Sequence, residues 1–453
     1  MASGSRPWGF TVAGFSEDGD DASRAPGGVR PDGQAAKPQA FAASADAPQA
    51  PAHNNLINRD NPSASQTTPG PPESRPQPAA RGALDRNPPR GQGSRWPSHG
   101  WPMEDPVPAY GALDLGTNNC RLLLAKPSRR GFRVVDAFSR IIRLGEGVAQ
   151  TGRLSDAAMD RTVEALRVCA AKLNRSGTQR VRCVATEACR IADNGSDFLT
   201  RVKRELGLDI EVLSREAEAG LAVAGCSSLI DYRSDYVLVF DIGGGSSELV
   251  WLDIQGQDAN AARVAPADRH GLRPAMAAWT SLPVGVVTLA ETFGGRTVTP
   301  DVFEAMVDHV LALIRPFEDE HKFCARTRNA SVHLLGTSGT VTTVAGIHLG
   351  LPRYDRSRVD GCWMHTQDVH DITYSLLDRT YEERVAEPCI GMDRADLVLA
   401  GCAILEAVIR TWPSERLRVA DRGLREGILT TLMSEDGVYR AGRRRRSGRG
   451  PGQ

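Results

Sequence analysis

Apolar segments separated by short turns mark where the chain begins to have enough aliphatic side chains to fold. Residues 110–115, 121–126 and 132–144 are rich in Val, Leu, Ile and Phe, and they predict three consecutive β-strands. From Ser155 the spacing changes, because apolar side chains recur every three or four positions as far as Leu173. This period predicts a helix.

Alternating strands and helices complete this first pattern. We expect a strand at 181–186, a helix at 196–206, a strand at 210–214 and a helix at 216–229. Three strands followed by alternating helices and strands is the order of a ribonuclease-H-like lobe.

The opening pattern occurs a second time from Tyr236. Residues 114–122 resemble residues 241–249, and apolar strands flank both segments. Two such repeats predict two similar α/β lobes that face each other across a cleft. In the second lobe the pattern predicts strands at 277–282 and 332–335, and helices at 301–317, 395–410 and 423–433.

Composition divides the 453-residue chain into four parts. Residues 1–105 are dominated by Pro, Ala, Gly and Ser, and they predict a disordered extension because few side chains can be buried. The folded part then holds a first lobe at 106–235 and a second lobe at 236–436. Residues 437–453 are rich in arginine and predict a disordered basic tail. Such a tail either contacts a polyanion or stays solvated, as blocks of like charge usually do.

Overall charge and cysteine usage narrow the class of protein. Lys plus Arg and Asp plus Glu each number 55, so net charge gives no argument for nucleic acid or a membrane surface. The nine cysteines include no Cys-x-x-Cys pair, which suits a reducing cytoplasm. We recognise no secretory signal, and the longest apolar run, 397–409, is shorter than the roughly 18 residues that span a bilayer. We therefore expect a cytoplasmic protein without a membrane-embedded part.

Each repeated opening places an aspartate, Asp114 or Asp241, at the end of an apolar strand and follows it with a glycine-rich turn. Glycine lets the backbone approach a ligand, and consecutive amides in such a turn can bind phosphate oxygens. A third turn of this kind lies at 336–340. One aspartate–glycine turn is most often a plain hairpin, but three together predict a phosphate site. The predicted members are Gly116, Thr117, Asn118, Gly243, Gly244, Gly245, Ser246, Ser338 and Gly339. Each of their hydroxyl groups is equally suited to a local turn hydrogen bond.

The segments DLGTN (114–118), DIGGGSSE (241–248) and GTSGT (336–340) together resemble the motifs of the exopolyphosphatase and guanosine pentaphosphate phosphohydrolase (Ppx/GppA) family, within the superfamily of actin, sugar kinases and heat-shock ATPases. Further segments follow in the family's order: ATEACR (185–190), SREAEA (214–219), SLPVG (281–285) and DRGLREG (421–427). The resemblance covers about 109–432. It implies an α/β fold of two ribonuclease-H-like (actin-like) lobes with a cleft between them.

The resemblance also implies roles for individual side chains. The family's general base, a glutamate that activates water, corresponds to Glu218. Many members carry two adjacent acids at this point, whereas Ala217 precedes Glu218 here, so Glu216 is the alternative base. Arg190 is similar to the arginine that grips the terminal phosphate.

Magnesium is the cofactor that the resemblance implies. Asp114, Asp241 and Glu248 resemble the carboxylates that hold the divalent ion. Mg²⁺ is usually bound through one or two carboxylates together with water and phosphate oxygens.

The implied reaction is removal of the terminal phosphate from inorganic polyphosphate, with conversion of pppGpp to ppGpp as the close alternative. The choice depends on whether basic side chains extend the cleft or a pocket accepts guanine. Arg353, Arg356 and Arg358 are candidates for contact with the chain, although a solvated loop explains them equally well. An actin-like kinase or ATPase is a further alternative, against which the glutamate segment at 214–219 argues. A non-catalytic nucleotide-dependent regulator is another.

The partners follow from the same resemblance. We expect a polyphosphate or guanosine polyphosphate substrate, no membrane and no specific nucleic acid, and we leave homodimer formation open. Longer family members carry an additional helical domain at the carboxyl terminus. Because the sequence ends soon after Met433, we expect that domain to be absent.

Overall fold

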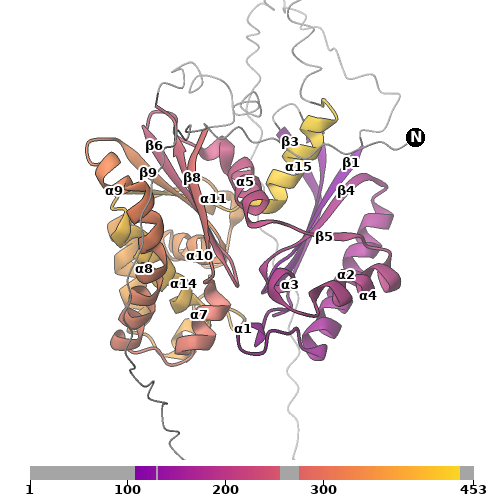
Figure 1. Ribbon diagram of the computed structural model, residues 1–453, viewed down its shortest axis with the longest axis horizontal. Coiled ribbons are helices and arrows are strands. Elements are labelled where there is room, and N and C mark those ends of the chain that lie inside the picture. The colour runs from indigo at the N-terminus through magenta and orange to yellow at the C-terminus, as the bar shows by residue number, and fades with distance from the viewer. Residues whose placement is uncertain (1–107, 129–130, 256–274, 439–453) are drawn as a thin grey trace, which may run out of the picture. The chain divides into compact units, whose positions relative to one another are not determined.

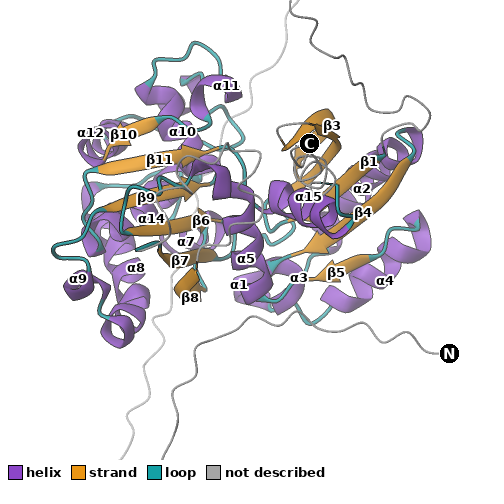
Figure 2. Cartoon of the chain, turned by 90° about the horizontal axis from the view of Figure 1, so that it is seen from above, coloured by secondary structure: helices purple, strands orange, loops and turns teal. Residues whose placement is uncertain are grey.

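The computed structural model describes residues 108–128, 131–255 and 275–438. The predicted extension, 1–105, lies outside these residues, as does nearly all of the predicted tail, 437–453. The described residues form one sheet of five strands and one of six, each combined with helices (Figures 1 and 2).

The first sheet has the strand order β3-β2-β1-β4-β5. Strand β1 pairs antiparallel with β2 and parallel with β4, so a hairpin precedes a crossover through a helix. The elements of this lobe are β1 (Ala109–Leu115), β2 (Asn119–Ser128), β3 (Gly131–Ile141), α1 (Val148–Thr151), α2 (Asp156–Arg175), β4 (Thr178–Ala185), α3 (Glu187–Ile191), α4 (Gly195–Leu206), β5 (Ile210–Val212) and α5 (Arg215–Cys226). The strands and long helices predicted for this lobe are confirmed, whereas the short α1 and α3 were not predicted.

The second sheet has the strand order β10-β11-β9-β6-β7-β8 (Figure 2). Strand β6 pairs antiparallel with β7 and parallel with β9, which repeats the pairing of β1 with β2 and β4. The elements are β6 (Tyr236–Ile242), β7 (Ser247–Asp253), β8 (Ala275–Leu282), α7 (Val286–Phe293), α8 (Pro300–His321), α9 (Phe323–Arg326), β9 (Val332–Thr337), α10 (Gly339–His348), α11 (Arg356–Val359), β10 (Trp363–His365), α12 (Thr366–Leu377), α13 (Tyr381–Ala386), α14 (Val398–Thr411), β11 (Arg416–Ala420) and α15 (Leu424–Glu435). The repeated lobe predicted from the sequence is therefore present.

Alternate residues of the two central strands face different helices. In β1, Leu113 packs in a core with α2 and α4, whereas Ala112 packs in another core with α15. In β6, Phe240 packs with α8 and α14, whereas Val239 packs with α5. Since the side chains of a strand alternate with a period of two, this arrangement places helices on both faces of each sheet.

Helices α5 and α15 pack against each other between the two sheets (Figure 1). A Cβ atom at Gly225 would lie 2.0 Å from the carbonyl oxygen of Gly423, and one at Gly427 would lie 2.0 Å from that of Leu221. Only glycine permits so close a crossing. The sequence assigns α15 to the second lobe, 236–436, but its apolar side chains pack on β1 and β2 of the first lobe.

The longest apolar run of the sequence forms most of α14, which packs against α8 in the core of the second lobe. The one acidic side chain inside this run, Glu406, is buried and accepts a hydrogen bond of 2.9 Å from Arg410. Among the described residues, no helix has both the length and the apolar character needed to cross a membrane.

Candidate active site

The two repeated turns have the same backbone geometry. The amide of Gly116 donates to the carbonyl of Asn119 over 2.9 Å, and the amide of Gly243 donates to the carbonyl of Ser246 over the same distance. A Cβ atom at Gly244 would lie 3.0 Å from the Cβ of Thr117, so the two turns are in near contact. The two glycine turns predicted from the repeat therefore meet at one place.

Neighbouring backbone amides bind the carbonyl oxygens of both turns. In the first turn, Thr117 O accepts from the amide of Gly145 over 2.9 Å, and Asn118 O accepts from the amide of Ile142 over 2.8 Å. In the second turn, the first amides of α7 donate to Gly243 O and Gly244 O, over 3.0 and 2.9 Å. Because these oxygens are already engaged, they do not oppose an anion that approaches the turns.

The third glycine turn, 336–340, is the junction between β9 and α10. Ser338 caps the helix, since its hydroxyl accepts from the amide of Val341 over 3.1 Å. The hydroxyl of Ser246 donates to Glu248 over 2.9 Å. The sequence left two roles open for these hydroxyl groups, contact with phosphate or a local hydrogen bond. In the structure both serines make the local hydrogen bond. Gly339 begins α10, and a helix N-terminus attracts anions.

A cavity of about 590 Å³ lies among the three turns and is lined by residues of both lobes. The predicted site residues that line it are Asp114, Gly116, Thr117, Asn118, Glu218, Asp241, Gly243, Gly244, Gly245, Ser246, Glu248, Ser338 and Gly339. Arg190 is the predicted residue that does not line this cavity.

Glu218 lies in the first turn of α5, which begins after the capping residue Ser214. Its side chain is only 12% exposed and faces the cavity. Burial and the negative charge of Glu248 raise its pKa to about 8, although Arg190 opposes this rise. The alternative base, Glu216, is exposed and does not line the cavity, so the geometry favours Glu218.

Arg190 lies beside Glu218 instead of in the cavity wall. Its guanidinium donates to Glu218 over 3.0 Å, to Glu187 over 2.6 and 2.8 Å, and to the carbonyl of Leu213 over 2.6 Å. Arg215 holds the other oxygen of Glu187 over 2.6 Å. The structure thus places Arg190 where it fixes the carboxylate of Glu218.

Buried carboxylates line the cavity, among them those of Asp114, Asp241 and Glu248. Burial and the charge of Glu218 raise the pKa of Asp241 to about 7, and burial and the charge of Asp241 raise the pKa of Glu248 to about 7. Burial also raises the pKa of Asp114. Hydroxyls of Ser246 and Ser281 each donate to Glu248 over 2.9 Å. Within the described ranges, no group of three or more His, Cys, Asp or Glu side chains is arranged to hold a metal ion.

Of the three arginines that the sequence offered for contact with the phosphate chain, Arg356 lines the cavity and donates to Glu426 over 2.8 Å. Arg353 and Arg358 do not line it.

Sequence reasoning missed further cationic residues of the cavity wall, among them Arg121 and Arg425. The repeat itself carried the signal for Arg121. Arg121 lies opposite Asp114 on the neighbouring strand, just as Glu248 lies opposite Asp241. In the repeat, Arg121 therefore occupies the position equivalent to that of Glu248. Arg425 belongs to the quoted segment 421–427, but no role had been given to it.

Two α/β lobes of repeated topology, with three glycine turns and buried carboxylates in the cleft between them, define a protein of the actin-like fold class. The chain belongs to the Ppx/GppA phosphatase family, whose family model matches residues 124–436. The chain is similar to the guanosine-5'-triphosphate,3'-diphosphate pyrophosphatase of Photobacterium profundum, with 28% identity over 340 residues. This match covers 72% of the chain and 60% of the length of that relative.

Solved structures of the same family agree with this fold. The crystal structure of the Aquifex aeolicus Ppx/GppA family member is 28% identical and has a TM-score of 0.57, and the match covers 73% of this chain and 99% of that chain. An exopolyphosphatase from Cytophaga hutchinsonii ATCC 33406 is 23% identical with a TM-score of 0.62, and the match covers 72% and 98%. At this identity the latter supports the fold alone.

Proposed function

We propose that this protein is a phosphohydrolase that removes the terminal phosphate of inorganic polyphosphate in the cytoplasm. One observation carries the proposal: Glu218, a buried carboxylate with a pKa of about 8, faces a cavity lined by three glycine turns. Conversion of pppGpp to ppGpp by the same site is the second candidate, and the name of the Photobacterium relative favours it.

The proposed reaction needs one proton transfer. Water attacks the terminal phosphorus, and its proton passes to the carboxylate of Glu218. The bond from that phosphorus to the bridging oxygen breaks, and the shortened chain leaves with the electron pair. A general base is most effective when its pKa lies near the working pH, which a value of about 8 satisfies. Arg190 is a positioning residue, because it fixes the carboxylate and does not line the cavity.

The rest of the cavity is suited to the charge that phosphoryl transfer develops. The N-terminus of α10 and the guanidinium groups of Arg121, Arg356 and Arg425 offer positive charge. The turns at 116–118 and 243–246 offer backbone that can approach the anion closely. Of these groups, Arg356 is held in place by its hydrogen bond to Glu426.

A magnesium ion is part of the proposal. No three acidic side chains of the described residues are arranged to hold an ion together, but Mg²⁺ is usually bound through one or two carboxylates together with water and phosphate oxygens, and this smaller donor set is present. Among the described residues, nothing donates a hydrogen bond to the side chain of Asp114 or Asp241, and burial raises the pKa of both. A divalent cation would relieve the repulsion between such carboxylates. Asp241 and Glu248, with Asp114 opposite, would hold the ion, which supplies charge compensation to the phosphates when bound.

Two other classes make different predictions. A kinase of this fold would transfer phosphate to an acceptor hydroxyl instead of to water. A non-catalytic regulator would not depend on the charge of Glu218. The buried carboxylate base argues against a non-catalytic regulator, because burying an ionisable group is costly and is typical of catalytic sites. The glutamate segment at 214–219 argues against the kinase.

Release of orthophosphate from polyphosphate and from pppGpp tests the proposal. We expect Glu218→Gln to reduce turnover by about two to four orders of magnitude, the scale of a lost general base. Glu216→Gln is the matched control, because it changes an exposed carboxylate of the same helix turn, and we expect it to keep full activity. Full activity of the Glu218 variant would refute the proposal, and the ratio of the two substrate activities decides between the candidates.

A further inference from the structure

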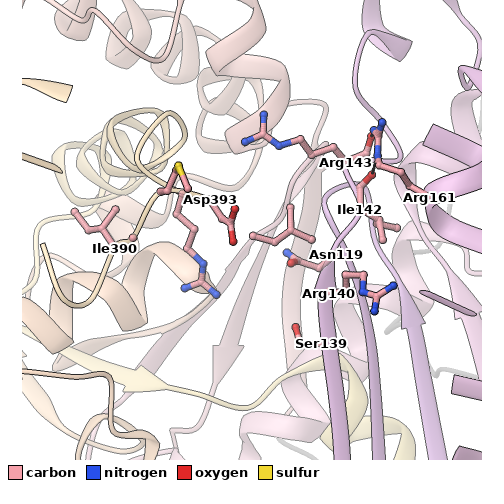
Figure 3. A pocket seen from close by; sticks show the side chains of 12 residues that line it. Asn119, Ser139, Arg140, Ile142, Arg143, Arg161, Ile390 and Asp393 are labelled. Carbon is pink, nitrogen blue, oxygen red and sulfur yellow. Dashed lines mark hydrogen bonds between the residues drawn. The ribbon is translucent and has the colours of Figure 1, made fainter. Parts of the chain in front are cut away.

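A second cavity, of about 620 Å³, opens beside the catalytic one. Four arginines line it, three from the first lobe, namely Arg140, Arg143 and Arg161, and Arg394 from the second. One acid, Asp393, lines it as well. Figure 3 shows the first-lobe side chains on one side of this cavity, with Ile390 and Asp393 across from them.

This arginine cavity is continuous with the catalytic one. Asn119, Ser139, Ile390 and Arg394 line both. Asn119 immediately follows the first glycine turn, and a Cβ atom at Gly339 would lie 3.8 Å from the guanidinium carbon of Arg394. An anion bound at the glycine turns can therefore extend into the arginine cavity without leaving the protein surface.

The four arginines differ in whether a carboxylate neutralises them. Arg143 pairs with Asp396 over 3.0 Å, and Arg161 pairs with Glu146 over 3.2 Å. Within the described part of the chain, no carboxylate lies within salt-bridge distance of Arg140, and the same holds for Arg394. The two stand on different lobes, so an anion between them would satisfy both.

We propose that the arginine cavity binds phosphate groups of the substrate that are not hydrolysed. The proposal rests on the proposed function, because it concerns the remote part of the same substrate. Guanidinium groups bind phosphate oxygens through paired, charge-assisted hydrogen bonds, which suits a polyanion better than a neutral group. The remote phosphates have two possible sources, the inner phosphates of a linear chain and the 3′-diphosphate of pppGpp.

Charge reversal at the exposed edge of this cavity tests the inference. Arg140 is exposed and lies outside the catalytic cavity, so Arg140→Glu leaves the core and the general base intact. Arg133→Glu is the matched control, because Arg133 is exposed on the same strand and lines neither cavity. Both variants change the net charge equally.

Substrates of two lengths separate remote binding from catalysis. We expect Arg140→Glu to raise KM for long-chain polyphosphate by about tenfold, the effect of losing one hydrogen bond to a charged group. KM for tripolyphosphate, which carries only two phosphates beyond the one hydrolysed, changes less, and kcat for both substrates stays unchanged. If the 3′-diphosphate is the ligand, the same contrast appears between pppGpp and GTP. Equal changes for long and short substrates, or no change for any of them, would overturn the inference.

A binding measurement keeps this inference separate from the proposed function. Calorimetric titration with long-chain polyphosphate measures affinity without appreciable turnover when it compares Glu218→Gln with the double variant that carries Glu218→Gln and Arg140→Glu. Should the unaltered protein release no phosphate from any substrate, the proposed function fails. The cavity is then judged by binding alone, and equal affinities of the two proteins would refute it.

Discussion

The ion pair between Arg190 and Glu218 offers a sharp test of the site, because the structure and the family resemblance assign different roles to the arginine. The resemblance has it grip the terminal phosphate, whereas the structure places it 3.0 Å from Glu218 and outside the cavity wall. Arg190→Gln removes the positive charge but keeps a side chain that can donate hydrogen bonds. If Arg190 acts through Glu218, the variant changes the pKa of the base.

The sign and size of that change follow from the geometry. Arg190 lowers the pKa of Glu218, so its loss raises that pKa, and the base is ionised only at higher pH. An opposite charge within about 4–6 Å shifts a carboxyl pKa by about 1–3 units. Arg190 divides its hydrogen bonds between Glu218 and Glu187, so we expect the lower end, a rise of about one unit. Well below the pKa, this corresponds to about a tenfold loss of activity.

The assay is kcat/KM as a function of pH, from about pH 6 to 10. For Arg190→Gln we expect the acid limb to move to higher pH and the activity to approach that of the unaltered protein at the alkaline end. Arg215→Gln is the matched control, since Arg215 bonds Glu187 but not Glu218, and its acid limb should not move. A deficit of equal size at all pH values, with a raised KM, would show that Arg190 grips phosphate and would refute our reasoning.

Three further predictions concern stability and the metal. Alanine in place of a helical glycine normally stabilises a protein by about 1 kcal/mol. Gly427→Ala, however, would place a Cβ atom 2.0 Å from the carbonyl oxygen of Leu221, so we expect the free energy of unfolding in urea to fall by about 2 kcal/mol. A rise would contradict the close crossing of α5 and α15. Burial lowers the pKa of His333 to about 4, so the folded protein keeps it neutral while the unfolded chain binds a proton below about pH 6.5. Stability should therefore fall by up to about 3 kcal/mol as pH drops from about 6.5 to 4, and His333→Gln should flatten this dependence in unfolding curves. Chelation of divalent ions should abolish phosphate release. Ser281→Ala removes a hydrogen bond to Glu248, so it should raise the Mg²⁺ concentration for half-maximal activity about tenfold. An unchanged Mg²⁺ concentration would argue against Glu248 as a ligand.

The strands of the repeat and most long helices were predictable because their apolar periods are regular, but α10, α12 and the strands β10 and β11 were not predicted. Strand β10 has three residues and β11 has five. Both are too short to show a long alternation of apolar and polar side chains. Periodicity also could not show that α15 returns to the first lobe. That placement depends on Gly427 and on which apolar surface remains uncovered, and both are tertiary properties.

The acidic half of the site was predictable and most of the basic half was not. Asp114 and Asp241 follow from a repeated motif, since each ends a strand before a glycine turn. Arg356 was one of three arginines that the sequence offered, but Arg394 and Arg425 come from separate segments that only the tertiary fold brings to the cleft. Arg190 shows the converse, because a motif located it while only the structure revealed that it contacts Glu218.

The repeat also explains why the two lobes do not have equal roles. Directly across the strand pair from Asp114 stands Arg121, whereas across from Asp241 stands Glu248. Like charges in directly opposed positions destabilise a sheet, and opposite charges do not. The first lobe thus carries its own counter-charge, and Arg121 lowers the pKa of Asp114. The second lobe lacks one at the equivalent position, and the pKa of both Asp241 and Glu248 rises to about 7. We therefore expect the proposed cation to lie nearer to Asp241 and Glu248 than to Asp114, whose charge Arg121 already offsets.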